Sequence, residues 1–309
     1  MKSRPKCVAS IGIFDGVHLA HSAILKRMVF QAKAGGLKSL LISFYPHPMC
    51  FYHKKFSGYI TLPEEKIRIL KETGLNYFWQ VKFDKKIAGM PGEEFINYIL
   101  RFFNIKKIIV GSDFKLGRKA ETGVKKLSEI CGDRGVEVEA VKQIRKEEFV
   151  VKSSLIRRLI RKRDFHQAGL FLGRPYFISG VVRKGRGIGK GSLVPTINLS
   201  VENKVLPSDG VYLSKVRYKN RVYPAVSYLG IPPSFKGRQR VFETHIIGFN
   251  KDIYKDFAEV VLIKYLRRQY RFKYISNLKT RIKEDINTAE KFFSRHNILR
   301  FLQPLPTTH

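Results

Sequence analysis

Two histidines stand where the sequence passes from a predicted buried strand into a predicted helix. The apolar run over residues 7–14 ends at Asp15-Gly16, and apolar residues then recur at helical spacing over residues 18–34. His18 and His21 are three residues apart at the start of this helix, so they share a face. A helix N-terminus carries free N–H groups and partial positive charge, and with two imidazoles it suits a triphosphate better than a metal ion. Taken alone, an HxxH pair most often marks surface histidines without a ligand.

A second set of residues that could carry out chemistry lies in the other half of the chain. Residues 185–191 form a glycine-rich loop with basic side chains, of a kind that can wrap N–H groups around phosphates or simply connect two strands. It is neither a P-loop nor a Rossmann fingerprint. Thr196 and Asn198 follow, two residues apart, so on a strand both side chains point to one face. Their hydroxyl and amide oxygens could there hold Mg²⁺.

The elements that must position these residues differ between the two halves. Strands and helices alternate over residues 1–165, which predicts βαβ units on a parallel, Rossmann-like sheet. Its strands are expected at residues 7–14, 39–44, 78–83, 107–110 and 136–141, and its helices at 18–34, 63–71, 91–103, 124–131 and 153–160. Parallel sheets place their ligands at the carboxyl ends of the strands, where the histidine segment lies.

The character of the chain changes after Leu172-Gly173-Arg174-Pro175. Five strand-like runs follow at residues 176–182, 210–216, 221–229, 241–247 and 259–266, separated by turn residues. They predict a small antiparallel barrel, and the amphipathic stretch 276–295 predicts a helix packed on it. We therefore expect an α/β domain over residues 1–168 and a β-barrel domain over residues 169–309.

Composition excludes some classes of protein and leaves one question open. The chain has 309 residues, 44% of them hydrophobic, enough for a sizeable core and against disorder along the whole chain. The chain has 59 lysines and arginines and 25 aspartates and glutamates, which gives a net charge of +34. Such a strongly positive charge is common in nucleic-acid-binding proteins. The basic residues are spread over both halves, however, and the preferred interpretation is a general affinity for anions, including phosphorylated small molecules.

Cysteine content and hydropathy bear on the compartment. The three cysteines, Cys7, Cys50 and Cys131, show no CxxC spacing, which argues against a disulfide framework or zinc site and favours a reducing cytoplasm. No apolar run approaches the roughly 18 residues that span a bilayer. The N-terminal segment shows no signal-peptide pattern. Membrane and secreted proteins are not expected.

Several motifs, in order along nearly the whole chain, resemble those of the prokaryotic bifunctional riboflavin kinase/FAD synthetase family. Residues 12–21 (GIFDGVHLAH) are similar to its nucleotidyltransferase signature GxFDGVHxGH. Further similar segments are FYPHP at 44–48, GSDFKLG at 111–117, VKSSLIR at 151–157, LGRPY at 172–176, VPTINL at 194–199, LPSDGVY at 206–212 and FETH at 242–245. Together they are far more specific than any one of them.

The resemblance implies that the first domain transfers AMP from ATP to FMN, giving FAD and pyrophosphate. His18, His21 and Arg157 would then stabilise the reacting phosphates, since imidazole and guanidinium groups donate hydrogen bonds to phosphoryl oxygens. His47 and Asp113 would bind the flavin. The expected ATP-binding residues of this domain come from its first turn and its last helix: Gly12, Phe14, Asp15, Ser153 and Ser154.

For the second domain, the resemblance implies phosphorylation of riboflavin by ATP, giving FMN and ADP. Glu243 would take the proton from the attacking hydroxyl, and Thr196 and Asn198 would hold Mg²⁺. Arg267 would bind the flavin. Gly187 and Gly189 would bind the phosphates of ATP. The expected partners are thus the small molecules riboflavin, FMN and ATP, with no membrane partner, and the sequence does not indicate an oligomeric state.

Three alternatives remain at this stage. Ala20 and Lys152 depart from the family pattern, which usually has glycine and serine there, so the chain could be a riboflavin kinase with a weakened adenylyltransferase domain. The charge leaves open a basic nucleic-acid-binding protein on this scaffold, which would require a continuous basic face with exposed aromatics. A flavin sensor that binds without turnover is the third.

Overall fold

The computed structural model describes residues 4–52, 56–146, 148–183, 194–231 and 240–296. The chain divides into two compact units, residues 1–153 and 154–309. The elements of the first unit are β1 Lys6–Ile11, α1 Leu19–Ala34, β2 Lys38–Tyr45, α2 Pro48–Tyr52, α3 Pro63–Lys71, β3 Tyr77–Lys82, α4 Lys85–Gly89, α5 Gly92–Leu100, β4 Asn104–Gly111, β5 Lys115–Leu116, η1 Arg118–Ala120, β6 Thr122–Gly123, α6 Val124–Gly132, β7 Glu137–Val141, β8 Arg145–Lys146 and β9 Phe149–Val150.

A parallel sheet organises the first unit, as predicted. Its strand order is β3-β2-β1-β4-β7, with every neighbouring pair parallel. The chain moves from β1 to β2 on one side and later returns to β4 on the other, so β1 is central. Ligands of such sheets bind where the order reverses, beyond the carboxyl ends of the strands. The fold therefore directs attention to the loops after β1, β2 and β4.

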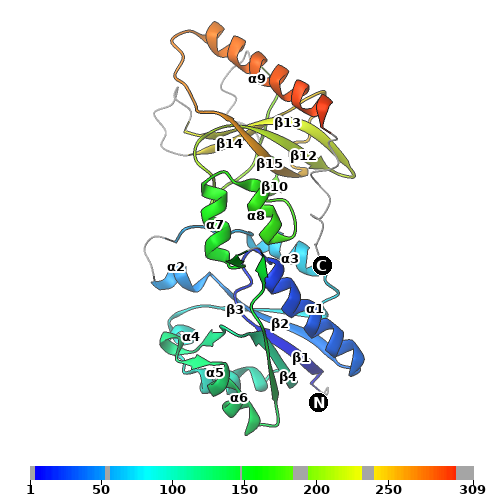
Figure 1. The fold of residues 1–309 in the computed structure, drawn as a ribbon, viewed down its shortest axis with the longest axis vertical. Coiled ribbons are helices and arrows are strands. Elements are labelled where there is room, and N and C mark those ends of the chain that lie inside the picture. The colour runs from blue at the N-terminus through cyan, green and yellow to red at the C-terminus, as the bar shows by residue number, and fades with distance from the viewer. Residues whose placement is uncertain (1–3, 53–55, 147, 184–193, 232–239, 297–309) are drawn as a thin grey trace. The chain divides into compact units, whose positions relative to one another are not determined.

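Helices cover both faces of this sheet (Figure 1), and apolar side chains of the strands pack against them. Successive residues of β1 alternate between the two layers: Cys7, Ala9 and Ile11 pack with residues of α5 and α6, whereas Val8 packs with α1. Because both faces are covered, the strands read as nearly continuous apolar runs rather than as alternating ones. The core thus immobilises the strand ends that carry the loops.

The first strand is shorter than the sequence predicted. We expected residues 7–14, but β1 ends at Ile11 because Gly12 is already turning and Phe14 adopts φ 51°. A backbone in the left-handed region cannot continue a strand. Residues 12–14, which were predicted to belong to the strand, therefore belong to the loop that follows it.

The second unit begins with helices and continues as an antiparallel sheet. Its elements are α7 Ser153–Arg161, α8 Phe165–Leu172, β10 Phe177–Val181, β11 Ile197–Asn198, β12 Gly210–Tyr218, β13 Arg221–Gly230, β14 Val241–Ile246, β15 Phe257–Arg267 and α9 Ile275–Arg295. The five predicted strands are present, and β11 and α8 are additional. A two-residue strand has too little sequence for a period to be visible, so β11 could not be found by alternation.

The six strands form a curled sheet in the order β10-β15-β12-β13-β14-β11. A bridge between Arg183, just after β10, and Asn198 of β11 joins the two ends of the sheet, with Arg183 N–H donating to the Asn198 carbonyl at 2.9 Å. This antiparallel, barrel-like sheet confirms the predicted architecture of the second half. The bridge also places Asn198 where the two edge strands of the sheet meet.

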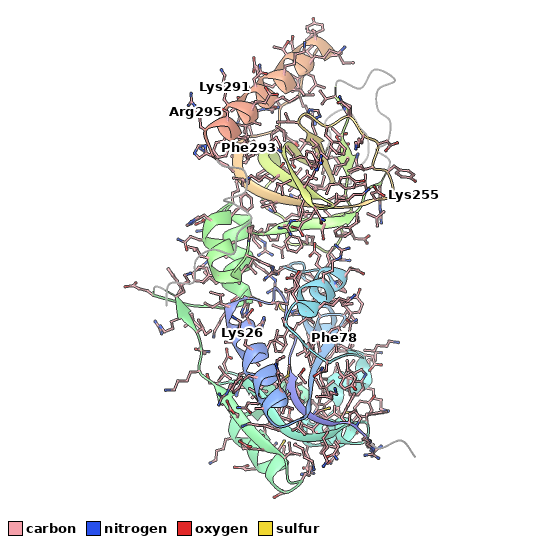
Figure 2. All side chains as sticks on the ribbon, turned by 90° about the vertical axis from the view of Figure 1, so that its right-hand side faces the viewer. Lys26, Phe78, Lys255, Lys291, Phe293 and Arg295 are labelled. Carbon is pink, nitrogen blue, oxygen red and sulfur yellow. The ribbon has the colours of Figure 1, made fainter. Side chains whose placement is uncertain are left out.

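The C-terminal helix α9 covers one face of this sheet, as its apolar stripe predicted. Ile286, Ala289 and Phe293 of α9 pack with Leu213 of β12 and Val226 of β13. In Figure 2, Phe293 lies on the strand side of α9, while Lys291 and Arg295 lie outside. Leu213 pairs with Val226, Val226 pairs with His245 of β14, and Glu243, two residues before His245, pairs with Asn198 of β11. Because directly paired residues share a face and faces alternate along a strand, the side chains of Leu213, Val226, Glu243 and Asn198 all belong to one face of the sheet.

Candidate active sites

The first candidate site is the edge of the parallel sheet where β1, β2 and β4 end. The histidine segment follows β1, His47 follows β2 and Asp113 follows β4. Since β1 lies between the other two strands, the three loops are neighbours. The sheet thereby brings the loop after β1, which was predicted to bind ATP, to the same edge as His47 and Asp113, which were predicted to bind flavin.

The two histidines are in contact at the start of α1. Their rings stack with centroids 3.6 Å apart and planes 14° from parallel. His18 is the N-cap, and its Nδ1 accepts from the His21 N–H at 3.4 Å. The buried His18 thus supports the more accessible His21 at the positive end of the helix. This arrangement can present imidazole and backbone N–H donors to phosphate oxygens.

The loop before the histidines is held in an uncommon backbone conformation. Phe14 and Val17 have positive φ values of 51° and 38°, which non-glycine residues rarely adopt. Gly16 has φ 87°, and a Cβ there would lie 3.2 Å from Ile60. At Gly12, an added Cβ would lie 3.0 Å from the Phe14 ring. The glycines are therefore required by the way the loop folds back on itself.

Asp15 anchors this loop from within. It is only 2% exposed, and its carboxylate accepts from the N–H groups of Ile60 at 3.0 Å and Thr61 at 3.1 Å. Thr61 Oγ1 also accepts from the N–H of Gly16 at 3.0 Å. The sequence prediction placed Asp15 among the ATP-binding residues; its observed contacts shape the loop that would bind ATP.

Ser153, the last residue of the first unit, contacts the same loop. Ser153 Oγ donates to the backbone carbonyl of Asp15 at 2.9 Å. Ser154 follows on the helix, and Arg157 lies one turn further along it, 6% exposed. The predicted roles of Ser154 and Arg157 at the phosphates stay predictions.

His47 and Asp113 differ strongly in their surroundings. His47 is buried, its N–H donates to the Tyr59 hydroxyl at 2.8 Å, and its ring lies 5.1 Å from that of Phe56. Asp113 is exposed, and its carboxylate lies 3.5 Å from the ammonium of Lys152. The rings around His47 are of the kind that stack on flat ring systems. Lys152, the departure from the family pattern, sits beside the predicted flavin-binding Asp113.

The second candidate site is built on the sheet of the second unit. Register places Glu243 of β14 directly opposite Asn198 of β11 on one side and Tyr228 of β13 on the other. Directly paired residues of antiparallel strands carry their side chains on the same face, with Cβ atoms about 5 Å apart. A carboxylate, an amide and a phenol therefore meet on one face.

Electrostatics of this face match a general base. Burial raises the pKa of the Glu243 carboxyl above its usual value. Burial also raises the pKa of Tyr228 to about 12, with the nearby charges of Asp209 and Glu243 adding to the rise and Arg267 opposing it. A carboxylate with a raised pKa accepts a proton more readily than an exposed one. The Tyr228 hydroxyl stays protonated and donates to Gln269 Oε1 at 2.8 Å.

Residues that could hold Mg²⁺ flank the carboxylate. Thr196 is exposed just before β11, and Asn198 is partly buried on it. Within the described residues, the buried Nδ2 atom of Asn198 has no hydrogen-bond partner; this N–H donor could meet an acceptor atom of a ligand, whereas a metal ion would need the amide oxygen. A hydroxyl and an amide oxygen are hard donors that suit Mg²⁺ when phosphates and waters complete its shell. Gly187 and Gly189, the predicted phosphate-binding glycines, lie outside the described residues.

Arg267, predicted to bind flavin, is engaged by α9. Its Nε donates to Asp285 Oδ1 at 2.9 Å, and an Nη donates to Asp285 Oδ2 at 2.6 Å. The other Nη donates to the carbonyl of Arg268 at 3.0 Å. Both side chains are about nine-tenths buried, so the pair fastens α9 to the end of β15. Its predicted contact with flavin stays a prediction.

Replacing Asp285 with alanine is expected to lower the free energy of unfolding of the second unit by about 3–5 kcal/mol, because it leaves the Arg267 charge buried without its carboxylate. Chemical unfolding followed by circular dichroism measures this. Glu284→Ala is the matched control: it breaks the exposed pair with Arg281 and is expected to cost less than about 1 kcal/mol. Equal losses in the two variants would contradict this account of how α9 is held.

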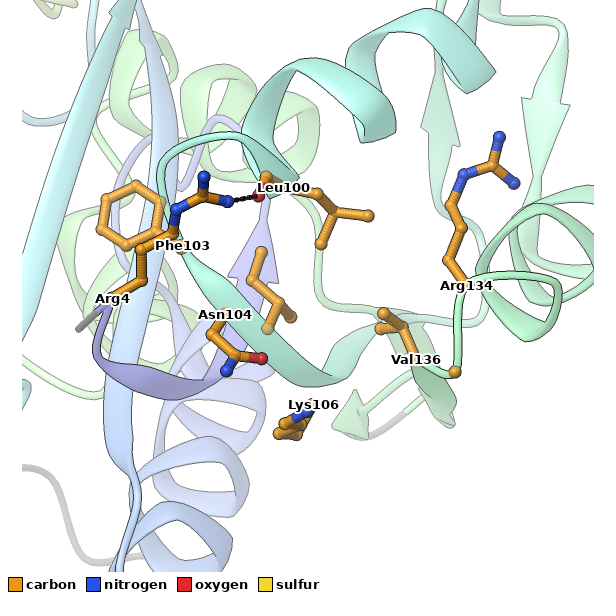
Figure 3. A pocket seen from close by; sticks show the side chains of 9 residues that line it. Arg4, Leu100, Phe103, Asn104, Lys106, Arg134 and Val136 are labelled. Atoms are coloured by element: carbon orange, nitrogen blue, oxygen red, sulfur yellow. Dashed lines mark hydrogen bonds between the residues drawn. The ribbon is translucent and has the colours of Figure 1, made fainter. Parts of the chain in front are cut away.

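A groove of about 400 Å³ lies at the opposite edge of the parallel sheet, where β4 and β7 begin (Figure 3). Two of its arginines are already engaged: Arg4 donates to the carbonyl of Leu100 at 3.0 Å, and Arg134 pairs with Glu93 at 2.7 Å. None of the predicted site residues lines it. The groove is thus separate from the candidate sites.

Comparison with known proteins accounts for both halves of the chain. A family model described as FAD synthetase matches residues 1–155, and one described as riboflavin kinase matches residues 172–293. The bifunctional riboflavin kinase/FMN adenylyltransferase of Buchnera aphidicola from Schizaphis graminum is 31% identical and covers 95% of this chain and 96% of its own length. The chain belongs to this family. The resemblance that the motifs indicated is confirmed.

A further relative and a solved structure are similar over nearly the whole chain. The bifunctional riboflavin kinase/FMN adenylyltransferase of Bacillus subtilis is 28% identical over 95% of this chain and 94% of its own. A crystal structure named as a macrolide-efflux protein from Streptococcus pneumoniae is 26% identical, with TM-score 0.79 and coverage of 93% and 95% of the two chains. Its fold is thus closely similar. Within the described ranges of this chain, no helix is long and apolar enough to cross a membrane.

Sequence reasoning missed several residues that shape the two sites of this family member. Thr61 and Lys66 secure the loop before the histidines, Tyr228 neighbours Glu243, and Asp285 holds Arg267. One signal was present: Glu65 and Lys66 both fall on the buried face of α3. A lysine on the apolar face of a helix indicates a buried partner. The other contacts depend on strand register and packing.

Proposed function

We propose that this chain makes both flavin cofactors: the second unit converts riboflavin and ATP to FMN and ADP, and the first converts FMN and ATP to FAD and pyrophosphate. The observation that carries the proposal is the pairing of Glu243 with Asn198 across β14 and β11. It sets a carboxylate with a raised pKa directly opposite an amide side chain, so that a base and an oxygen ligand for Mg²⁺ lie together, as phosphoryl transfer to a hydroxyl needs.

In the kinase reaction, the 5′-hydroxyl of riboflavin attacks the γ-phosphorus of ATP. Glu243 accepts the hydroxyl proton as the new O–P bond forms, and the bond to ADP breaks. Thr196 and Asn198 would hold Mg²⁺, which neutralises developing charge on the phosphates. Tyr228 neighbours Glu243 on the sheet and stays protonated, so it does not compete for the proton.

In the adenylyl transfer, a phosphate oxygen of FMN attacks the α-phosphorus of ATP and pyrophosphate leaves. This chemistry needs positioning and charge stabilisation rather than a covalent intermediate. His18, His21 and the N-terminal N–H groups of α1 would donate to the phosphates, with Arg157, Ser153 and Ser154 assisting. Gly12 and Phe14 shape the nucleotide site, and His47 with Asp113 would contact the flavin.

The organisation that goes with this function is an adenylyltransferase domain over residues 1–168 and a kinase domain over residues 169–309. Residues 156–171 lie between the two family matches, and the proposed boundary falls among them. A cytoplasmic location is proposed from the free cysteines Cys7, Cys50 and Cys131, of which Cys7 and Cys131 are buried.

A product analysis tests the proposal directly. Purified protein is incubated with riboflavin, ATP and Mg²⁺, and FMN and FAD are separated by chromatography over time. FMN is expected first and FAD after it. FMN without FAD would overturn the adenylyltransferase half, and absence of both products from a folded protein would overturn the proposal as a whole.

A further inference from the structure

A lysine lies buried beneath the loop that would hold the triphosphate. Lys66 of α3 is only 6% exposed. Its ammonium donates to the backbone carbonyl of Ile13 at 2.7 Å and approaches Ser43 Oγ at 3.3 Å. Lysines are rarely buried so completely without a specific partner. Here the partner is the backbone of the site itself.

The contact falls one residue before the strained part of the loop. Ile13 also accepts from Ser43 Oγ at 2.9 Å, so its carbonyl is held by both β2 and α3. Phe14 follows in the left-handed conformation, and its ring lies 4.7 Å from that of His21. A change at Ile13 would therefore be transmitted to Phe14 and from Phe14 to the histidine.

We propose that Lys66 is a positioning residue for adenylyl transfer: as an ammonium it fixes Ile13 and Phe14 under His21 and adds positive charge beneath the bound triphosphate. The inference rests on the proposed function of the first unit. Lys66 does not touch the reacting atoms. It acts through the loop, and its charge complements an anion that binds above it.

Burial makes the protonation of Lys66 sensitive to pH close to neutrality. Burial lowers its pKa to about 8, and the carboxylate of Asp15 opposes that change. From β2 it meets the neutral hydroxyl of Ser43, and on its own helix Glu65 instead accepts from the N–H of Leu62 at 2.8 Å. The ammonium is thus present at neutral pH and is lost as the pH rises through about 8.

The test compares Lys66→Arg, Lys66→Met and the wild-type full chain from pH 6.5 to 9.5. FAD formation from FMN and FMN formation from riboflavin are measured on each preparation. Wild type is expected to lose kcat/KM for FAD synthesis above about pH 8, whereas Lys66→Arg keeps it to higher pH because a guanidinium stays charged. In Lys66→Met, kcat/KM for FAD synthesis is expected to be at least tenfold lower than in wild type at every pH, while FMN formation stays within twofold of wild type.

Two controls separate positioning from folding. Lys71→Met removes an exposed lysine of the same helix and is expected to leave both activities unchanged. The fluorescence of Trp79, the single tryptophan of the chain, reports the fold of the first unit in each flavin-free variant. The inference would be overturned if wild type and Lys66→Arg lost FAD synthesis at the same alkaline pH. Full FAD synthesis by a folded Lys66→Met would also overturn it. Absence of FAD synthesis in wild type at every pH would instead overturn the proposed function beneath it.

Discussion

Glu243→Gln is expected to lower riboflavin phosphorylation by about 10²–10⁴-fold while FAD synthesis from supplied FMN continues at the wild-type rate. The amide keeps the shape of the side chain opposite Asn198 but cannot accept the hydroxyl proton. The two rates are measured separately, with riboflavin or FMN as substrate. Glu202→Gln, at an exposed position of the same unit, is the control and is expected to change neither rate.

The pH profile of riboflavin phosphorylation by the wild-type chain tests the same role of Glu243 as a base. Because burial raises the pKa of Glu243, its base form is lost at a higher pH than for an exposed glutamate. The kcat/KM for riboflavin phosphorylation should therefore fall as the pH is lowered, and the fall should occur at a pH above the ordinary glutamate range. Retained FMN formation in Glu243→Gln would remove this residue from the mechanism, and loss of both activities would indicate that the variant is misfolded.

His21→Ala is expected to have the opposite effect, a fall in FAD synthesis of about 10²–10³-fold with riboflavin phosphorylation unchanged. The size is that of removing one preorganised donor from a site that stabilises developing negative charge. His21 is the better choice than His18, because His18 also caps α1 and its loss would weaken the helix by about 1 kcal/mol.

The measurement is FAD formed from FMN and ATP, with FMN formed from riboflavin as the internal reference. His166→Ala, which removes an exposed histidine of α8, serves as the matched control and is expected to retain both activities. Wild-type FAD synthesis by His21→Ala would exclude this imidazole from adenylyl transfer. The stacked pair would then be a structural feature of the helix start.

The sequence by itself determined the alternation of elements, the change of architecture near residue 172 and the motifs of the family. These features are local, since a buried strand or an amphipathic helix is visible in the spacing of its own apolar residues. The βαβ pattern even indicated the sheet edge at which His18 and His21 lie, because parallel strands present their carboxyl ends together. It overextended the first strand because apolar residues of a buried loop look like those of a strand.

Only the tertiary structure decided which distant residues meet. Asn198 and Glu243 are 45 positions apart and pair through a register that a one-residue slip would reverse. The ammonium of Lys66 reaches Ile13 across 53 positions, and Asp285 takes the guanidinium of Arg267 through the packing of α9 on the sheet. Such contacts depend on how layers pack and how strands align, which residue type and spacing do not specify. The sequence therefore indicated the chemistry, and the packing of distant segments decided how its residues are held.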